Sequence, residues 1–271
     1  MPVAEFDQDY FDRLRAARDH WWVRGMQDVG TALLGAGGRP MRVLDAGCGV
    51  GSNSAWLTGV SAGGTVTGID VASAAVAVWH QSGAPDRVLQ ASVTSLPFAG
   101  SSFDLVVSLD VLQHLGRDDA GRALQETRRV LAPGGRLLIR TNARFGRRSV
   151  AEREDWRLYE PATLRDALTS AGLAVDHVTP VNALQGLWAS LPRVRLGGRH
   201  GGAHGNDGHA HQHADAGPHT HGLGIPRPAP RLRNEVLLRS LRAEALWLRG
   251  SRRRLPFGHS LYALAHRRDD H

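Results

Sequence analysis

The stretch VLDAGCGVG, residues 43–51, decides the fold that we expect for this chain. A short aliphatic run leads into a glycine-rich turn, and a segment typical of a helix follows in residues 52–57. A strand, a glycine turn and a helix in this order mark the place where open α/β sheets bind nucleotide-like ligands. Gly47, Gly49 and Gly51 would let a ligand approach the backbone where a Cβ atom would collide with it.

The spacing of this turn argues against a dinucleotide. The dinucleotide fingerprint is G-x-G-x-x-G, and Ser52 stands where its third glycine would be. Asp45 precedes the turn, and a carboxylate there would repel a pyrophosphate but attract an ammonium or a sulfonium. Asp70 ends the next expected strand, where an acidic side chain can accept both hydroxyls of a ribose. These features weigh against an NAD-dependent oxidoreductase.

Apolar strands alternate with amphipathic helices along most of the chain. This alternation predicts a largely parallel sheet that is covered by helices on both faces. The helix that begins near residue 118 is expected to end at Pro133-Gly134-Gly135. We expect strands at 41–47, 65–71, 87–93, 103–109, 135–141, 173–178 and 259–267, and helices at 21–34, 52–57, 72–81, 118–135, 161–171 and 231–250.

Composition narrows the class of protein. The 271 residues are 42% hydrophobic and 22% charged, as in an ordinary globular domain. No apolar run approaches the roughly 20 residues of a membrane helix, and the polar first residues lack the apolar core of a signal peptide. Cys48 is the single cysteine, so no internal disulfide framework exists. We therefore expect a cytoplasmic protein.

The net charge of +7 comes entirely from arginine, because the chain has no lysine. Most of the excess follows residue 193. One interpretation is an anionic partner, such as nucleic acid, a lipid surface or a phosphorylated substrate. The other is a solvated basic face, which we favour because no aromatic residues alternate with the arginines to stack on bases.

These residues resemble the class I S-adenosylmethionine-dependent methyltransferases, particularly the small-molecule group that includes quinone-biosynthesis enzymes. The resemblance rests on VLDAGCGVG, on the GID that ends at Asp70, and on SLPFAGSSFDLVVSLDVLQHL and RRVLAPGGRLLI further along. It covers about residues 41–141. It implies a Rossmann-like α/β fold with a seven-stranded, mostly parallel sheet, an antiparallel last strand, and S-adenosyl-L-methionine across the strand carboxyl ends.

The resemblance also implies a set of cofactor contacts. The three turn glycines would line the methionine part of the cofactor, Asp45 would bind its amino group, and Asp70 its ribose. Ser92 stands where the family often has an aspartate that contacts the adenine, so a serine hydroxyl or the backbone of Val93 would take over that contact. The full set of expected cofactor residues is Asp45, Gly47, Gly49, Gly51, Asp70, Val71, Ser92, Val93, Leu109 and Arg24.

The reaction expected for this family is methyl transfer to an O, N or C atom of a small metabolite. Such a transfer depends mainly on aligning the nucleophile with the methyl group, and a general base helps only a protonated nucleophile. His114 is the candidate base, and the alternative is that it packs in the loop after the fourth strand. Nucleic-acid methylation would predict an N/D-P-P-Y-like motif after that strand, and SLDVLQHL has none. We therefore expect no nucleic-acid partner.

Seven of the fourteen histidines lie in residues 199–222. Their irregular spacing, with glycine and alanine between them, does not match a structural zinc site. We expect a disordered loop that binds divalent metals adventitiously, and no metal ligands in the catalytic site. The alternative is a metal-binding protein built on a methyltransferase scaffold.

Five segments follow from this interpretation. Residues 1–40 would form a helical cap, 41–182 the cofactor-binding core, 183–198 with 223–255 a lid on the substrate side, and 256–271 the final strand; residues 199–222 are the histidine-rich loop. The helix at 231–250 could be a lid, part of the core, or a surface that touches anionic lipid. Its expected buried face consists of Leu232, Val236, Leu237, Leu241, Ala245 and Leu248.

Overall fold

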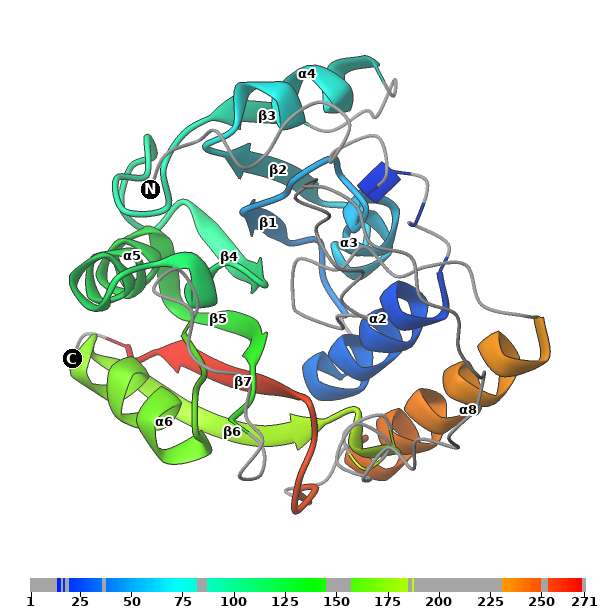
Figure 1. The fold of residues 1–271 in the computed structure, drawn as a ribbon. Helices are drawn as coiled ribbons and strands as arrows, with labels where there is room; N and C mark the ends of the chain where they lie inside the picture. Colours follow the sequence, from blue (N-terminus) through cyan, green and yellow to red (C-terminus); the bar gives the residue numbers. More distant parts are fainter. Residues whose placement is uncertain are drawn as a thin grey trace, which may run out of the picture.

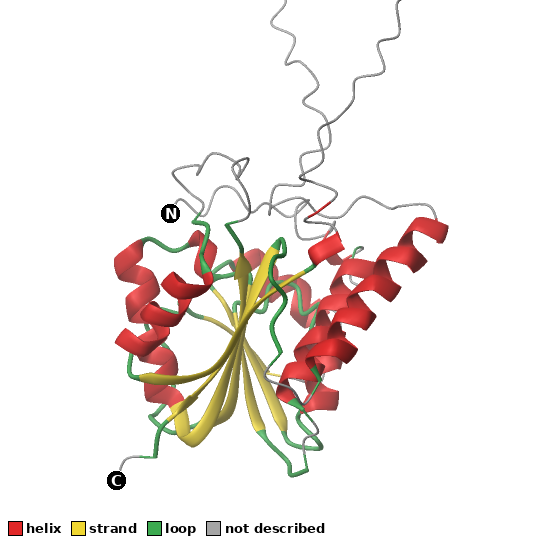
Figure 2. Cartoon of the chain, turned by 90° about the horizontal axis from the view of Figure 1, so that it is seen from below, coloured by secondary structure: helices red, strands yellow, loops and turns green. Residues whose placement is uncertain are grey.

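A seven-stranded sheet crosses the centre of the molecule, with helices on both faces (Figures 1 and 2). The computed structural model describes residues 14–15, 17, 20–35, 38–81, 87–144, 157–184, 187, 231–249 and 253–269. The strands are β1 (Arg42–Ala46), β2 (Thr65–Asp70), β3 (Arg87–Gln90), β4 (Phe103–Leu109), β5 (Leu131–Asn142), β6 (Leu173–Val181) and β7 (Ser260–Arg267). The helices are α2 (Trp21–Leu34), α3 (Ser54–Val60), α4 (Ser73–Gln81), α5 (Arg117–Val130), α6 (Pro161–Ser170) and α8 (Arg231–Leu248), with the short turn η2 (Leu112–His114).

The strand order is β3-β2-β1-β4-β5-β7-β6. The pairs from β3 through β5 are parallel, and β7 runs antiparallel between β5 and β6. This confirms the expected mostly parallel sheet with an antiparallel last strand. The order reverses between β1 and β4, and open α/β sheets bind ligands at the strand carboxyl ends beside such a reversal.

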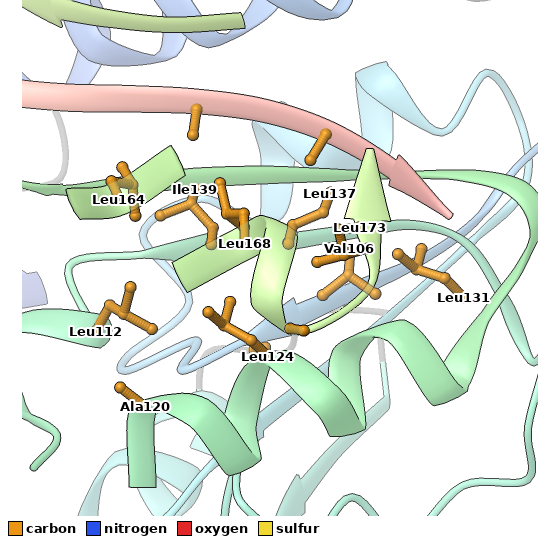
Figure 3. Close-up of a cluster of buried hydrophobic side chains, with 14 of the residues drawn as sticks. Val106, Leu112, Ala120, Leu124, Leu131, Leu137, Ile139, Leu164, Leu168 and Leu173 are labelled. Atoms are coloured by element: carbon orange, nitrogen blue, oxygen red, sulfur yellow. The ribbon is translucent and has the colours of Figure 1, made fainter. Parts of the chain in front are cut away.

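The helices form two layers because the strands are apolar on both sides. On one face α5 and α6 pack Leu124, Leu164 and Leu168 against β4 and β5 (Figure 3). On the other face α2, α3 and α8 cover the sheet through residues such as Met26 and Leu57. Helix α4 joins this second layer, because Trp79 packs on Val88 and Gly68.

The junction between α5 and β5 differs from the expectation. Helix α5 ends at Val130, three residues before Pro133, and β5 already begins at Leu131. Phe103 pairs with Leu131, but Leu105 pairs with Arg136, so the Pro-Gly-Gly segment is accommodated as an irregularity of the β4–β5 ladder. Proline lacks the N–H of a regular ladder, and Gly134 has a φ of +67°, so a bulge suits both residues.

The buried face of α8 also differs from the expectation. Leu241, Ala245 and Leu248 are buried as expected, but Leu232 and Val236 are 78% and 52% exposed. Leu238, which was not expected on the buried face, is buried, and Leu237 is partly buried. The reason is the crossing with α2, where a Cβ atom on Gly25 would lie only 2.7 Å from the Cβ of Leu241. Leu241 therefore lies at the centre of the contact with α2. Leu232 and Val236 lie on the opposite side of α8 and face outwards.

Several expectations fall on residues that the structure does not describe. These are the histidine-rich segment 199–222, nearly all of the expected lid in 183–198 and 223–230, and most of the expected helical cap before residue 20.

Candidate cofactor site

The glycine turn after β1 is anchored to the end of β2. The N–H groups of Gly47 and Cys48 both donate to the Ile69 carbonyl, at 2.9 Å each. Gly47, Gly49 and Gly51 have φ values of +90°, +52° and +77°, which only glycine adopts readily. The sequence folds into this tight turn because three left-handed positions alternate with ordinary ones.

The three glycines are required for different reasons. A Cβ on Gly47 would collide with Val111, and one on Gly51 would lie 2.7 Å from the Trp79 ring, so both make room for protein side chains. At Gly49 the nearest described atom to such a Cβ is Cδ2 of Leu14, at 3.8 Å. Of the three turn glycines, Gly49 is therefore the one at which a Cβ would collide with no described atom.

Asp70 lies at the tip of β2, directly against the turn. Its carboxylate accepts hydrogen bonds from the N–H of Gly49 at 2.8 Å and from the N–H of Ala72 at 2.9 Å. Burial raises the pKa of Asp70, and the hydrogen bonds from Ala72 and Gly49 oppose this rise. The carboxylate is thus held in one orientation at the edge of the sheet, with lone pairs left for a further donor.

Asp45 lies one strand over and deeper in the molecule. It pairs in register with Gly68 of β2 and Val107 of β4, and it is only 1% exposed. The pKa of the Cys48 thiol is raised, first by burial and then by the negative charges of Asp45 and Asp70. The turn therefore lies in a negative potential, which favours a positively charged ligand.

The segments that follow β2 and β3 carry three further residues of the expected cofactor set. Val71 follows β2 and is 55% exposed beside Asp70. The N–H of Ala91 donates to the Asp70 carbonyl at 2.9 Å, which brings Ser92 and Val93 to the same edge. The Ser92 hydroxyl lies 2.8 Å from that of Thr94 and accepts from the Thr94 N–H at 3.2 Å. The Ser92 side chain therefore stabilises the turn in which it lies.

A partly buried ion pair follows β4. Leu109 is 7% exposed and packs in the cluster beneath α2. Asp110, with a φ of +60°, accepts hydrogen bonds from Nε and Nη2 of Arg140, the first at 3.0 Å. Arg140 is 5% exposed. Burial lowers the pKa of Arg140, but Asp110 and Tyr262 outweigh it and raise the pKa overall.

This pair connects the sheet to α2. The Arg140 guanidinium lies 4.4 Å from the centre of the Trp22 ring, and the Tyr262 hydroxyl donates to the Met26 carbonyl at 2.8 Å. Arg140 was not predicted from the sequence, although an arginine inside the apolar run RLLIRT indicates that an acidic partner lies nearby.

His114 lies in η2, immediately after Gln113. The backbone N–H of His114 donates to the Val111 carbonyl at 2.9 Å, and the imidazole side chain is partly exposed. Gln113 is buried, and its side-chain oxygen accepts from the Thr141 hydroxyl and the Asn142 N–H, at 3.2 Å each. The turn that carries His114 is therefore fastened to β5.

Helix α2 approaches the turn from the other side. The Gln27 amide donates to the Ser52 carbonyl at 3.3 Å and to Asn53 Oδ1 at 3.0 Å. Arg24 lies one turn earlier on α2 and is exposed. Trp21 is 7% exposed and packs with Leu238 and Leu241 of α8, which is a core position.

Among the described residues, no three His, Cys, Asp or Glu side chains are grouped as metal ligands. In the same part of the chain, none of the helices combines the length and the hydrophobicity that crossing a bilayer requires.

A family model described as a methyltransferase domain matches residues 44–139, from β1 through β5. The first curated relatives match only a part of the chain. A malonyl-[acyl-carrier protein] O-methyltransferase of Pseudescherichia vulneris is 36% identical over 105 residues, which cover 39% of this chain and 40% of the relative. The chain thus spans less than half the length of such relatives.

Two further comparisons extend beyond the core. A solved S-adenosylmethionine-dependent methyltransferase from Mesorhizobium loti superposes with a TM-score of 0.50 at 18% identity, covering 86% of this chain and 94% of that one, which shows the shared fold. The "probable S-adenosylmethionine-dependent methyltransferase" of Mycolicibacterium smegmatis is 30% identical over 192 residues, 69% of this chain and 70% of the relative. The chain therefore belongs to the class I S-adenosylmethionine-dependent methyltransferases.

Proposed function

We propose that this protein transfers a methyl group from S-adenosylmethionine to an O, N or C atom of a small metabolite, at the edge formed by the glycine turn, Asp70 and the loop after β4. The observation that carries the proposal is the Asp70 carboxylate, which the N–H groups of Gly49 and Ala72 hold against the turn. A carboxylate fixed there can accept the hydroxyls of a ribose.

The residues at this edge fit S-adenosylmethionine on three grounds. No described atom lies closer than 3.8 Å to a Cβ placed on Gly49, so this is the least crowded of the three turn glycines. The exposed apolar side chain of Val71 lies next to Asp70 and could pack on a purine. Asp45 and Asp70 together create a negative potential at the turn, and the cofactor carries a sulfonium and an ammonium.

Each assigned residue then has a distinct task. Asp70 would bind the ribose, and Asp45 would attract the ammonium group of the methionine part from below the turn. The Val93 backbone would serve the adenine, because the Ser92 hydroxyl already interacts with Thr94. Arg24 would meet the cofactor carboxylate from α2.

When bound, the cofactor supplies an activated methyl group. The protein's own contribution would be to hold the acceptor in line with that group and to exclude water. Leu109 would flank the cofactor from β4. His114, on the turn that Gln113 fastens to β5, would take a proton from an acceptor that arrives protonated.

The acceptor would be selected outside the matched family domain. The match to the malonyl-[acyl-carrier protein] enzyme covers only 39% of this chain, and α2, α6 and α8 lie outside residues 44–139. We therefore propose a small-molecule acceptor without adopting the substrate of that relative. A cytoplasmic location and the absence of a nucleic-acid partner stay predictions.

An assay for S-adenosylhomocysteine release tests the proposal. The protein is incubated with S-adenosylmethionine and a panel of phenols, carboxylic acids, amines and enolisable carbon acids. We expect release with at least one class and its loss in Asp70→Ala. Release that is equally fast in Asp70→Ala would contradict the proposed site.

A further inference from the structure

The outer face of α8 carries apolar side chains that the described part of the chain leaves exposed. Leu232 is 78% exposed, Val236 52%, Leu246 67% and Trp247 50%. The inner face of the same helix is buried through Leu238, Leu241, Ala245 and Leu248. Packing against the described residues therefore explains the apolar side chains on only one side of the helix.

The exposed apolar side chains share one face of the helix as a stripe, which Arg239 interrupts near the middle. Leu232, Val236, Ala243 and Trp247 are spaced by four, seven and four residues, and Leu246 lies beside them, so all five share a face of the helix. At 1.5 Å per residue, the 18 residues of α8 extend over about 27 Å. The helix lies at the margin of the molecule, with α2 along its inner side (Figure 1).

Arginines border this apolar stripe. Arg233 and Arg249 are exposed near the two ends of α8, and the Arg253 guanidinium lies 4.4 Å from the centre of the Trp247 ring. Arg239 lies within the stripe, 4.0 Å from Glu235, and Arg242 contacts Asp28 of α2 at 3.0 Å. The described arginines around the stripe thus outnumber the acids that pair with them.

We propose that the outer face of α8 docks on the surface of an anionic phospholipid bilayer, with the helix lying in the plane of the interface. Apolar side chains would enter the region between headgroups and acyl chains, while arginines bordering them would bind lipid phosphates. Tryptophan and arginine both suit this boundary, because each has an apolar body and a polar end. The inference does not depend on the proposed methyl transfer.

The charges argue against a second copy of the chain on this face. A twofold interface must be complementary to itself. Pairing two such stripes would bring their bordering arginines together, with only Glu235 available on the stripe to offset them. An anionic surface removes that repulsion and matches the basic balance of the whole chain, whose isoelectric point is about 10.9.

Vesicle co-sedimentation of the full chain tests the proposal. We expect binding to phosphatidylcholine vesicles that contain about 30% phosphatidylserine, weak binding to phosphatidylcholine alone, and a decrease as NaCl rises from about 0.1 to about 0.5 M. The double variant Leu246→Gln/Trp247→Gln should bind at least about fivefold more weakly, because two large apolar side chains no longer enter the interface. Leu89→Gln, at a 43% exposed apolar position on β3, is the matched control and should bind normally.

A second pair of variants separates the helix from general charge. Arg249→Glu and Arg122→Glu change the net charge equally, but Arg122 lies on α5, on the other face of the sheet. We expect at least about fivefold weaker binding for Arg249→Glu only. Wild-type binding by the Leu246/Trp247 double variant would overturn the proposal, because the attraction would then come from other basic segments. A dimer that this double variant abolishes, without vesicle binding by the wild type, would also overturn it and assign the face to a second copy.

Discussion

At the scale of single residues, Gly49 and Gly51 separate ligand binding from folding. Both have left-handed φ values, but only Gly51 lies against a buried ring, that of Trp79. Gly49→Ala should cost about 1–2 kcal/mol of the free energy of unfolding and weaken S-adenosylmethionine binding about tenfold or more. Gly51→Ala should cost about 2–5 kcal/mol, since the collision with Trp79 adds to the strain.

Urea unfolding and titration calorimetry check these two variants. A folded Gly49→Ala variant that binds the cofactor as tightly as the wild type would show that the turn does not face the ligand.

Asp70 predicts a pH dependence of cofactor binding. The ionised carboxylate accepts hydroxyl hydrogen bonds, and protonation removes that capacity. Because burial raises the pKa of Asp70, the carboxylate becomes protonated at a higher pH than an ordinary aspartate does. The affinity for S-adenosylmethionine should therefore begin to fall at that higher pH on acidification. Asp70→Asn should bind about 1–3 kcal/mol more weakly near neutral pH and lose this dependence. Calorimetry between about pH 4 and 7 measures both effects. The same pH dependence in Asp70→Asn would assign it to another group.

The site residues could be predicted from the sequence only in part. Gly49 and Asp70 were found because they lie in one local pattern whose spacing has a chemical meaning, and the structure joins them by a hydrogen bond. The Asp110–Arg140 pair was not found, because it joins two strands through a contact 30 residues apart in sequence. Local spacing carries no information about such a partner.

At the scale of elements, the contact between α2 and α8 depends on Gly25. A Cβ there would lie 2.7 Å from Leu241 Cβ, so Gly25→Ala should lower the free energy of unfolding by about 1–3 kcal/mol. Gly121→Ala is the matched control within α5, where no described atom lies within 4 Å of the added Cβ. It should stabilise the protein by about 0.5–1 kcal/mol. Chemical denaturation measures both, and equal effects would contradict the proposed close packing.

Element positions were predictable where one periodic pattern governs a segment. Helix α2 covers the predicted residues 21–34, because its apolar residues have helical spacing and Gly35 ends the helix. The start of β5 and the orientation of α8 were wrong, because neighbouring elements decide them. Leu131 belongs to β5 because it pairs with Phe103 of β4. Leu232 and Val236 are exposed because α8 packs on α2 through its opposite side, at Leu241.

At the scale of the whole molecule, the sheet order places the loops after β1, β2 and β4 at one edge, next to the reversal between β1 and β4. Alternating strands and helices predict this arrangement, because parallel strands require crossover helices. The antiparallel direction of β7 was predicted from the family resemblance, because periodicity alone does not specify the direction of a strand.

The histidine-rich segment should be dispensable for the cofactor. Deleting residues 199–222 is expected to leave S-adenosylmethionine affinity within about twofold of the wild type, because shortening a loop changes its closure entropy only slightly. The same deletion should remove most Ni²⁺ and Zn²⁺ binding. Calorimetry with each ligand distinguishes the two effects, and loss of cofactor binding on deletion would contradict the separation of this segment from the site.

The most direct test of the account is a crystal structure of the protein with S-adenosylhomocysteine. The account predicts the ribose hydroxyls within hydrogen-bond distance of the Asp70 carboxylate, with the amino acid part of the ligand over Gly49. A ligand bound elsewhere, with Asp70 still held only by the Gly49 and Ala72 N–H groups, would contradict it.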